Sequence, residues 1–351
     1  MKDTPVTADS EAFRVLAALP PRHRLMMLTM GRVIAQVIWV LTDLRVADHL
    51  ADGPKPVTEL ARLTGADPLA LRRILRCATA YGVFVERPGG EYELTPMSDF
   101  LRAGAPQSLR DLVLMNGTEM FWRPYEAIAH TARTGRPSFE EVFGESLFGY
   151  LDHHPDSAEI FHRAMTATNR RGVGVIGGLL DLSSFSRVAD VGGGQGYLLA
   201  ELLVRHPQCK GVLFDRPSAV DGALPLLRER GVADRVELIA GDFFTEFPAG
   251  CDAYVLKFVL HDWPDDDAAR ILANARRALG NDGARLFVIE HIVEPPNTLD
   301  VVKFLDMDMM VFAGGRERTL EEFQELAGAA GLAFVADRSA AGLTVLEFRA
   351  R

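Results

Sequence analysis

The chain has 351 residues, enough for one or two domains with buried cores. An apolar content of 48% and a charged content of 25% are ordinary for a globular protein, and the net charge of −10 argues against holding nucleic acid by phosphate neutralisation. Three widely spaced cysteines give no Cys-x-x-Cys motif and no disulfide framework. The N-terminus lacks the apolar core of a signal peptide, and residues 33–41, the most apolar run, are too short to span a bilayer. We therefore expect a cytoplasmic protein without nucleic-acid or membrane partners.

Residues 11–50 have a helical pattern that is rich in apolar side chains. Their broad apolar surface is made by Met26, Met27, Met30, Val33, Ile34, Val37, Ile38 and Leu41. A buried core helix would explain this surface, but a small domain can hardly cover it from within. The pattern therefore favours a dimer interface.

Residues 56–103 are typical of a winged helix. Two short helices, the second capped by Asp67, precede a two-stranded wing around Pro88-Gly-Gly90. Three arginines lie on the second helix and suggest DNA binding: Arg72, Arg73 and Arg76. The acidic total charge favours the alternative, a solvated arginine face on a structural module.

Residues 105–180 form a helical connector that is dense in aromatic side chains. Most aromatic residues at helical spacing pack in a core, but apolar faces and thioethers also hold flat aromatic ligands. We expect a few of them to face a ligand cleft, with Trp122 and Phe148 as candidates.

From about residue 182 the pattern alternates between strand and helix, which predicts a parallel sheet with helices on both faces. Strands are expected near 187–191, 211–215, 236–240, 253–258, 285–290, 332–337 and 343–349. The last two leave no room for a helix between them and should pair antiparallel. A capping box at Thr319 opens the helix before them.

Residues 188–197 predict a buried strand, a glycine-rich turn and a helix start. Gly192 and Gly194, with the glycines around them, remove side chains where the backbone turns and where a ligand can approach closely. The helix N-terminus adds unpaired N–H groups and a partial positive charge. This pattern alone fits a dinucleotide, a nucleoside or merely a tight turn.

Two acids sharpen that interpretation. Asp215 ends the next strand, 19 residues after Gly196, where a carboxylate can accept hydrogen bonds from ribose hydroxyls. Asp242 and Phe243 follow the third strand, where they can bond an adenine amino group and cover its ring. The consecutive glycines depart from the Gly-x-Gly-x-x-Gly fingerprint, which favours an adenosine without a pyrophosphate.

Five segments appear in order: Asp190-Val-Gly-Gly-Gly-Gln-Gly196, Phe214-Asp-Arg-Pro217, Gly241-Asp-Phe-Phe244, Leu256-Lys-Phe-Val-Leu-His-Asp-Trp263 and Gly314-Gly-Arg-Glu-Arg-Thr319. The set resembles S-adenosylmethionine-dependent O-methyltransferases of the plant caffeate/flavonoid type, whose bacterial members modify aromatic natural products. The resemblance covers nearly the whole chain. It implies an α/β fold: a Rossmann-like class I methyltransferase sheet, parallel with one antiparallel strand, plus an N-terminal helical and winged-helix dimerisation domain.

The resemblance also implies a division of labour and a set of partners. Residues 1–104 would dimerise, residues 105–180 would line the acceptor pocket, and residues 181–351 would bind S-adenosylmethionine. We expect a homodimer, a small aromatic phenol as substrate, S-adenosylhomocysteine as product, and no metal. Lys257, in a strand that is otherwise apolar, is either an edge residue that reaches solvent or a cofactor contact, and the family uses it as a contact. Arg216 is a further candidate in the cofactor site. In the acceptor pocket Met165 and Asn169 match the helix that touches acceptor and cofactor, and Met307 and Met310 are candidates for a wall, although core packing is an alternative for both.

Methyl transfer from a sulfonium is a direct displacement. A phenol with a pKa of ~10 is mostly neutral at pH 7, so a base helps. His261 follows the fourth strand and matches the family's catalytic segment. Its second ring nitrogen needs an acceptor, and the family's flanking acids correspond to Glu290 and Glu317. Asp262 either supports this segment or caps the next helix.

Other classes of function fit less well. Some bacterial relatives keep the fold and the cofactor but catalyse hydroxylation or decarboxylation, and the retained His261 favours methylation instead. A winged-helix regulator that senses S-adenosylmethionine conflicts with the acidic charge. A nicotinamide dehydrogenase would need the absent pyrophosphate-binding fingerprint.

Overall fold

A computed structural model describes residues 19–280 and 283–351, with the side chains of 169–171 and 218 left aside. The chain divides into two compact units that are interleaved in sequence. The first unit runs to Glu126 and includes Leu151–Thr168, and the second comprises Ala127–Tyr150 and Asn169–Arg351. The part of the predicted N-terminal helix on residues 11–18 lies outside the described residues.

The first unit is mainly helical, with one small sheet. Its elements are α2 (Pro21–Thr29), α3 (Gly31–Asp43), α4 (Val46–His49), β1 (Lys55–Pro56), α5 (Val57–Thr64), α6 (Pro68–Ala80), β2 (Phe84–Glu86), β3 (Glu91–Leu94), α7 (Pro96–Asp99), α8 (Arg110–Asn116) and α9 (Glu119–Glu126). Asp67 caps α6 as predicted, because its carboxylate accepts a hydrogen bond from the Ala70 N–H at 2.8 Å. The predicted hairpin is also present, and β1 adds a third strand to it in the order β1-β3-β2. The winged-helix assignment itself stays a prediction.

The apolar residues of α2 and α3 divide into a buried and an exposed group. Leu41 is fully buried in the core of this unit, whereas Met26 is 55% exposed and Met30 is 42% exposed. No single helix of the described chain has the length and apolarity to cross a membrane; α2 and α3 meet those criteria only as a pair bent by 45°. The exposed group leaves apolar area for another surface to cover.

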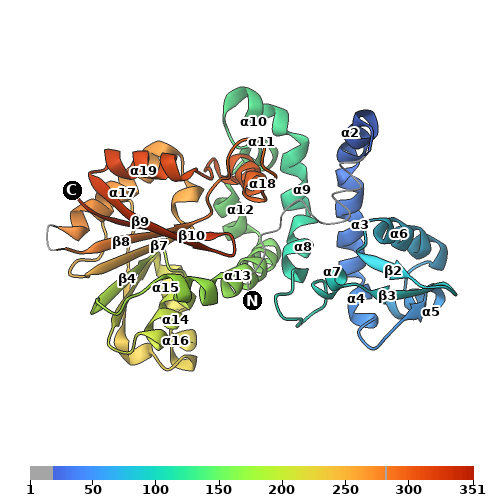
Figure 1. Cartoon of the computed structure of the whole chain (residues 1–351), viewed down its shortest axis with the longest axis horizontal. Helices are drawn as coiled ribbons and strands as arrows, with labels where there is room; N and C mark the ends of the chain where they lie inside the picture. The colour runs from blue at the N-terminus through green and yellow to red at the C-terminus, as the bar shows by residue number, and fades with distance from the viewer. Residues whose placement is uncertain (1–18, 281–282) are drawn as a thin grey trace. The chain divides into compact units, whose positions relative to one another are not determined.

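The second unit is built around a seven-stranded sheet (Figure 1). Its strands are β4 (Arg187–Val191), β5 (Lys210–Asp215), β6 (Val236–Ala240), β7 (Ala253–Lys257), β8 (Arg285–Glu290), β9 (Leu332–Ala340) and β10 (Leu343–Ala350). The order is β6-β5-β4-β7-β8-β10-β9, and β10 alone runs antiparallel to its neighbours β8 and β9. The predicted fold class is therefore confirmed, and all seven strands lie within a few residues of their expected positions.

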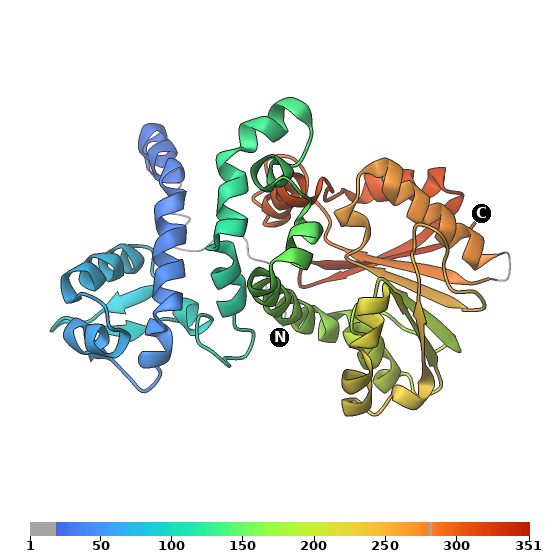
Figure 2. The same cartoon turned by 180° about the vertical axis from the view of Figure 1, so that it is seen from behind.

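Helices cover both faces of this sheet, as Figure 2 shows from behind. The unit's helices are α10 (Ile128–Thr134), α11 (Ser138–Phe143), α14 (Tyr197–Arg205), α15 (Pro217–Asp221), α16 (Leu224–Glu229), η1 (Ala233–Arg235), η2 (Leu260–Asp262), α17 (Asp265–Leu279), α18 (Val302–Asp308), the π-helix η3 (Met309–Ala313) and α19 (Leu320–Ala329). The helices α12 (Leu147–His153) and α13 (Pro155–Leu179) contribute to both units. One core packs the sheet against α17 and α19, and the other packs it against α14 and the end of α13.

The strand order fixes where a ligand can bind. From β4 the chain moves outward through β5 and β6, then returns to the other side of β4 with β7 and β8. The connections at the carboxyl ends of β4 and β7 therefore diverge and open a crevice, the place where open α/β sheets bind ligands.

Candidate active site

A tight turn joins β4 to α14 at this crevice. Gly192 and Gly194 have φ angles of +73° and +58°, a region that favours glycine. A Cβ atom on Gly192 would lie 2.8 Å from Cγ2 of Val259, and one on Gly193 would lie 2.7 Å from Oδ2 of Asp190. The turn therefore packs directly against Val259, which follows β7 and precedes His261 by two residues.

Asp215 ends β5 beside this turn. Its Oδ2 accepts a hydrogen bond from the Gly194 N–H at 2.8 Å, and its Oδ1 accepts one from the Arg216 N–H at 2.6 Å. Each carboxylate oxygen has further lone-pair capacity. Asp215 can therefore hold the turn and still accept hydrogen bonds from ligand hydroxyls, while the Arg216 side chain is exposed.

A buried acid and a half-buried lysine lie close to the turn. Asp190 in β4 is 1% exposed, and burial raises its pKa to about 7 although Lys257 opposes that shift. Burial lowers the pKa of Lys257 to about 8, against the charges of Asp190 and Glu290. Oδ2 of Asp190 has no hydrogen-bond partner among the described residues. A buried acceptor without a partner is costly, so this oxygen marks a place where a ligand donor or water is needed.

Aromatic rings connect the end of β6 with the segment after β7. Asp242 follows β6, and its Oδ1 accepts a hydrogen bond from the Phe244 N–H at 2.8 Å. The Phe243 carbonyl is held by Nδ2 of Asn274 at 2.8 Å. The ring centroids of Phe243 and Phe244 are 5.0 Å apart, and those of Phe244 and Trp263 are 4.6 Å apart. This apolar wall brings the predicted adenine contacts close to the histidine segment.

Carboxylates face both ring nitrogens of His261. Nδ1 lies 2.9 Å from Oε1 of Glu317 and 3.8 Å from Oε2 of Glu290, and Nε2 lies 3.4 Å from Oδ1 of Asp262. Because an ionised carboxylate can only accept, we assign the proton on Nδ1 to the hydrogen bond with Glu317. Asp262 therefore faces the histidine, and the N-terminus of α17 has no side-chain cap at Pro264.

The two glutamates have different partners. Glu290 ends β8 fully buried, and its Oε1 accepts hydrogen bonds from the N–H groups of Val259 at 3.2 Å and Leu260 at 2.9 Å. Glu317 is held through its own N–H, which donates to Oδ1 of Asp306 at 2.9 Å. Glu290 thus fixes the backbone that carries His261, while Glu317 orients the ring. Within the described part of the chain, Oε2 of each glutamate lacks a hydrogen-bond partner.

These charges make His261 strongly basic. Burial lowers the pKa of His261, but Glu290, Asp262 and Glu317 outweigh it and raise the pKa to about 10. Burial raises the pKa of Glu290 to about 7, although His261 opposes that shift. The carboxylates stabilise an imidazolium, so they favour proton transfer to this ring and also keep it protonated at neutral pH.

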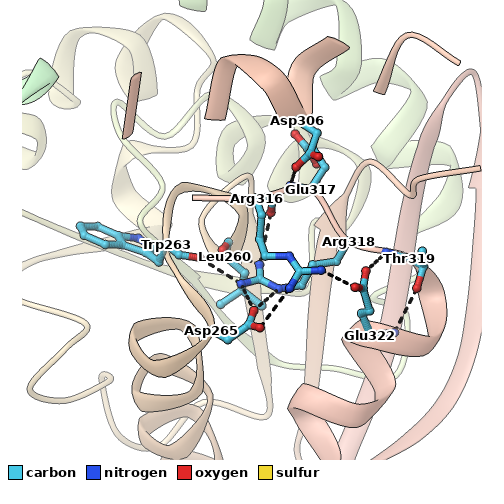
Figure 3. A network of polar contacts seen from close by, with 9 residues as sticks. All are labelled: Leu260, Trp263, Asp265, Asp306, Arg316, Glu317, Arg318, Thr319 and Glu322. Carbon is cyan, nitrogen blue, oxygen red and sulfur yellow. Dashed lines mark hydrogen bonds and ion pairs between the residues drawn. The ribbon is translucent and has the colours of Figure 1, made fainter. Parts of the chain in front are cut away.

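A buried arginine binds the backbone of Leu260 and Trp263, as Figure 3 shows, and these two residues flank His261 in the chain. Arg318 is 1% exposed and donates to the carbonyl oxygens of Leu260 and Trp263, each at 2.9 Å. Its charge is balanced by Oδ1 of Asp265, which it contacts at 2.7 and 3.0 Å. The Arg316 N–H adds a hydrogen bond to the His261 carbonyl at 2.8 Å. The segment that supplies Glu317 therefore also fixes the position of η2.

Phe258 links the end of β7 to this ring. Its φ angle is +53°, which costs about 1–3 kcal/mol for a bulky residue, and its N–H donates to the Ile289 carbonyl at 3.0 Å. The Phe258 ring stacks against His261 at 5.5 Å and against His291 at 4.9 Å. This strained conformation places an aromatic face against the imidazole.

Comparison with known proteins assigns the family. Residues 125–333 match the O-methyltransferase domain, and residues 26–104 match the O-methyltransferase dimerisation domain. The chain belongs to the O-methyltransferase family. It is 38% identical to the phenazine O-methyltransferase of Lysobacter antibioticus over 335 residues, which cover 95% of this chain and 97% of that protein. We therefore describe it as an S-adenosylmethionine-dependent O-methyltransferase that carries a dimerisation domain.

Two other relatives bear on the chemistry of the family. An O-methyltransferase from neocarzinostatin biosynthesis, solved with S-adenosylmethionine and 2-hydroxy-5-methyl naphthoic acid, matches with a TM-score of 0.77 and 32% identity, covering 90% of this chain and 96% of that one. The aclacinomycin 10-hydroxylase of Streptomyces purpurascens is 33% identical over 321 residues, covering 90% of this chain and 85% of the relative. The family thus includes a hydroxylase, the alternative that the sequence left open.

The residues of this O-methyltransferase fit its cofactor. Three features of the site suit a hydroxylated ligand with N–H or O–H donors. The glycine turn leaves no room for side chains, the Asp215 carboxylate has spare lone pairs, and Oδ2 of Asp190 lacks a hydrogen-bond partner among the described residues. The partly buried ring of Phe243 adds an apolar face, which is what a purine ring requires. The candidates Gly192, Gly194, Asp215, Arg216, Asp242, Phe243 and Lys257 all lie at or next to the carboxyl ends of β4 to β7.

The acceptor candidates are spread over both units. Trp122 and Met165 are partly exposed in the first unit, and the side chain of Asn169 lies outside the described residues. In the second unit Phe148 is 38% exposed on α12. Met307 follows Asp306, the partner of Glu317, and Met310 lies on η3, whose Phe312 packs edge-on against Phe139 of α11. Both methionines therefore belong to α18 and η3, the two helices that precede Glu317 in the chain.

The supporting roles of three residues were not predicted from the sequence. Asp190 was visible inside the glycine motif, and a charged residue in a strand of apolar residues was the available signal. Arg318 lies in the Gly-Gly-Arg-Glu-Arg-Thr segment, but its partners are backbone carbonyls that no pattern identifies. The positive φ angle of Phe258 has no signal in the sequence either.

Proposed function

We propose that this enzyme methylates a phenolic hydroxyl of an aromatic natural product and that His261 accepts the phenol proton. The proposal rests chiefly on one relationship: Nδ1 of His261 lies 2.9 Å from Glu317, in a segment that packs against the glycine turn. The bound naphthoic acid of the neocarzinostatin relative supports an aromatic acceptor.

Each residue of the cluster has a distinct task in this proposal. When bound, S-adenosylmethionine supplies a methyl group on a positively charged sulfur. Nε2 of His261 takes the proton as the phenol oxygen becomes a nucleophile, and Glu317 stabilises the resulting imidazolium. Glu290 and Arg318 keep the backbone of η2 in place, and the Phe243, Phe244 and Trp263 rings exclude water. A cationic ligand nearby lowers the pKa of His261, which frees its resting proton at neutral pH.

We further propose which parts of the chain carry these tasks. Residues 1–104 form the homodimer interface, and the exposed apolar side chains of α2 and α3 support this. Residues 105–180 line the acceptor pocket, with Trp122, Phe148, Met165 and Asn169, together with Met307 and Met310, in contact with the acceptor. Residues 181–351 bind the cofactor through the residues at the strand ends. The methyl transfer itself needs no metal.

Product mass tests the proposed function. Incubation with S-adenosylmethionine and a panel of phenols should yield products heavier by one methyl group, together with S-adenosylhomocysteine. The His261→Ala variant should lose this activity and still bind S-adenosylhomocysteine. A product that gains oxygen or loses carbon dioxide instead would favour the second candidate, a hydroxylase or decarboxylase, which the 33% identical aclacinomycin 10-hydroxylase keeps open.

A further inference from the structure

An unpartnered oxygen of Glu290 and a bonded oxygen of Glu317 both lie close to Nδ1 of His261. His261, Glu290 and Glu317 each offer a ligand atom, and these atoms all lie within 4.8 Å of one another. Nδ1 of His261 is 2.9 Å from one glutamate and 3.8 Å from the other. Buried carboxylate oxygens are normally satisfied, so Oε2 of Glu290 and Oε2 of Glu317 are an unusual pair.

The spacing and the donor types suit a small transition-metal dication. Zinc takes imidazole nitrogen and carboxylate oxygen at about 2.0–2.2 Å, which places neighbouring ligands of a tetrahedron about 3.3–3.5 Å apart. The observed separations of 2.9 and 3.8 Å bracket that range. Magnesium prefers six oxygen ligands and fits a site with a histidine less well.

The cluster is also rigid and reachable. Oε1 of Glu290 is fixed by two backbone N–H groups, the backbone of Glu317 is anchored to Asp306, and Oε1 of Glu317 contacts Nδ1 of His261, so the three ligand groups are held together without a metal. The side chain of His261 is 15% exposed, whereas those of Glu290 and Glu317 are 0% and 1% exposed. An ion can therefore enter past the imidazole, and water can complete its coordination.

We propose that His261, Glu290 and Glu317 form a binding site for Zn²⁺ and that its occupation inhibits methyl transfer. Binding displaces the proton of Nδ1 to solvent and replaces the hydrogen bond to Glu317 with a metal–nitrogen bond. The remaining ring proton then sits on Nε2, so the imidazole can no longer accept a proton from the phenol. The inhibition rests on the proposed base role of His261, whereas the binding site does not.

Zinc binding is measured on the full-length enzyme after chelator treatment and desalting, by competition with a chromophoric zinc indicator. We expect one ion per chain. Glu290→Gln and Glu317→Gln preserve side-chain shape and should each weaken binding at least about tenfold. The matched control Glu229→Gln removes an exposed carboxylate on α16 and should change neither binding nor activity. Thermal unfolding and S-adenosylhomocysteine binding verify that each variant is folded.

Two results would overturn the proposal. Binding that is absent, or that survives both glutamine substitutions in folded variants, removes the site. Stoichiometric zinc that depends on both glutamates but leaves phenol methylation unchanged removes the inhibition and argues against His261 as the base. Cobalt(II) binding provides an independent test of the site. A four-coordinate cobalt site absorbs visible light intensely, and the His261→Gln variant should lose this absorption.

Discussion

Gly315 lies against the backbone of His261 so closely that no side chain fits between them. A Cβ atom on Gly315 would overlap the His261 carbonyl oxygen and lie 2.8 Å from the carbonyl oxygen of Asp262. Both obstacles are backbone atoms, which cannot rotate away. The glycine therefore allows the segment that carries Glu317 and Arg318 to dock onto the histidine segment.

Gly315→Ala should consequently displace His261. A misplacement of about 1 Å in a catalytic group can cost about 10²-fold in rate, so we expect a loss of that size in kcat with a smaller change in cofactor affinity. The overpacked backbone should also cost about 1–3 kcal/mol of stability, measured by denaturant unfolding. Gly174→Ala is the control, because a Cβ there meets no atom within 4 Å. Equal kcat for the two variants would show that the contact does not position His261.

His261→Ala tests the base directly. Proton removal by a positioned base contributes about 10²–10⁴ in rate, so methylation of an ordinary phenol should fall by that factor. Binding of S-adenosylhomocysteine, measured by calorimetry, should be nearly unchanged. A nitro-substituted phenol that is already ionised at neutral pH should suffer much less. Equal losses for both acceptors would contradict the assignment.

The pH dependence should carry the signature of the carboxylates around His261. Because its pKa is raised to about 10, the fraction of unprotonated base grows as pH rises above 7, and kcat/KM should increase on that limb by up to about tenfold per pH unit. Glu317→Gln removes a negative neighbour, so the imidazolium becomes less stable and the limb should move to lower pH. Both enzymes are measured with the same acceptor, so the ionisation of the acceptor contributes equally to the two pH profiles. An unshifted limb would show that Glu317 does not act on His261.

Arg318 should act on the reaction through the backbone alone. Arg318→Lys keeps the charge but cannot reach the two carbonyl oxygens of Leu260 and Trp263 and Asp265 together, so we expect kcat to fall about tenfold with KM little changed. Arg318→Met should lose more activity and about 1.5–3 kcal/mol of stability. The partial rescue by lysine separates positioning from simple misfolding. Arg316→Lys, at a half-exposed side chain, is the control.

The elements were readable from the sequence because each has a local cause. Buried strands such as β4 and β7 are short apolar runs, and Asp67 and Thr319 begin helices by capping them. The positions of the cofactor-site candidates, of His261 and of Glu290 could be predicted for a related reason, since each lies at or after the end of a strand and parallel strands bring their ends to one edge. His261 and Glu290 are the clearest cases.

Contacts between segments that are far apart in the chain were not readable in the same way. The sequence could not decide between Glu290 and Glu317, because the 2.9 Å contact depends on how the segment after η3 docks onto η2. That docking depends on Gly315 and on a guanidinium that binds carbonyl oxygens, which every residue possesses. The sequence could not decide the role of Asp262 either, because a short carboxylate side chain at this position suits both a contact with His261 and a cap on α17.

Asp215→Asn isolates the cofactor side of the crevice. The amide keeps the shape of the carboxylate, but only one of its terminal atoms accepts, so the hydrogen bonds to the Gly194 and Arg216 N–H groups cannot both persist alongside bonds to ligand hydroxyls. Loss of charge-assisted hydrogen bonds costs about 1.5–3 kcal/mol, which corresponds to about 10–150-fold weaker binding of S-adenosylhomocysteine by calorimetry. At saturating cofactor, the pH range over which activity rises as His261 loses its proton should be unchanged. Asp215 ends β5, which β4 separates from the β7 strand that leads to His261. A shifted limb with unchanged cofactor affinity would place Asp215 in the proton-transfer apparatus instead.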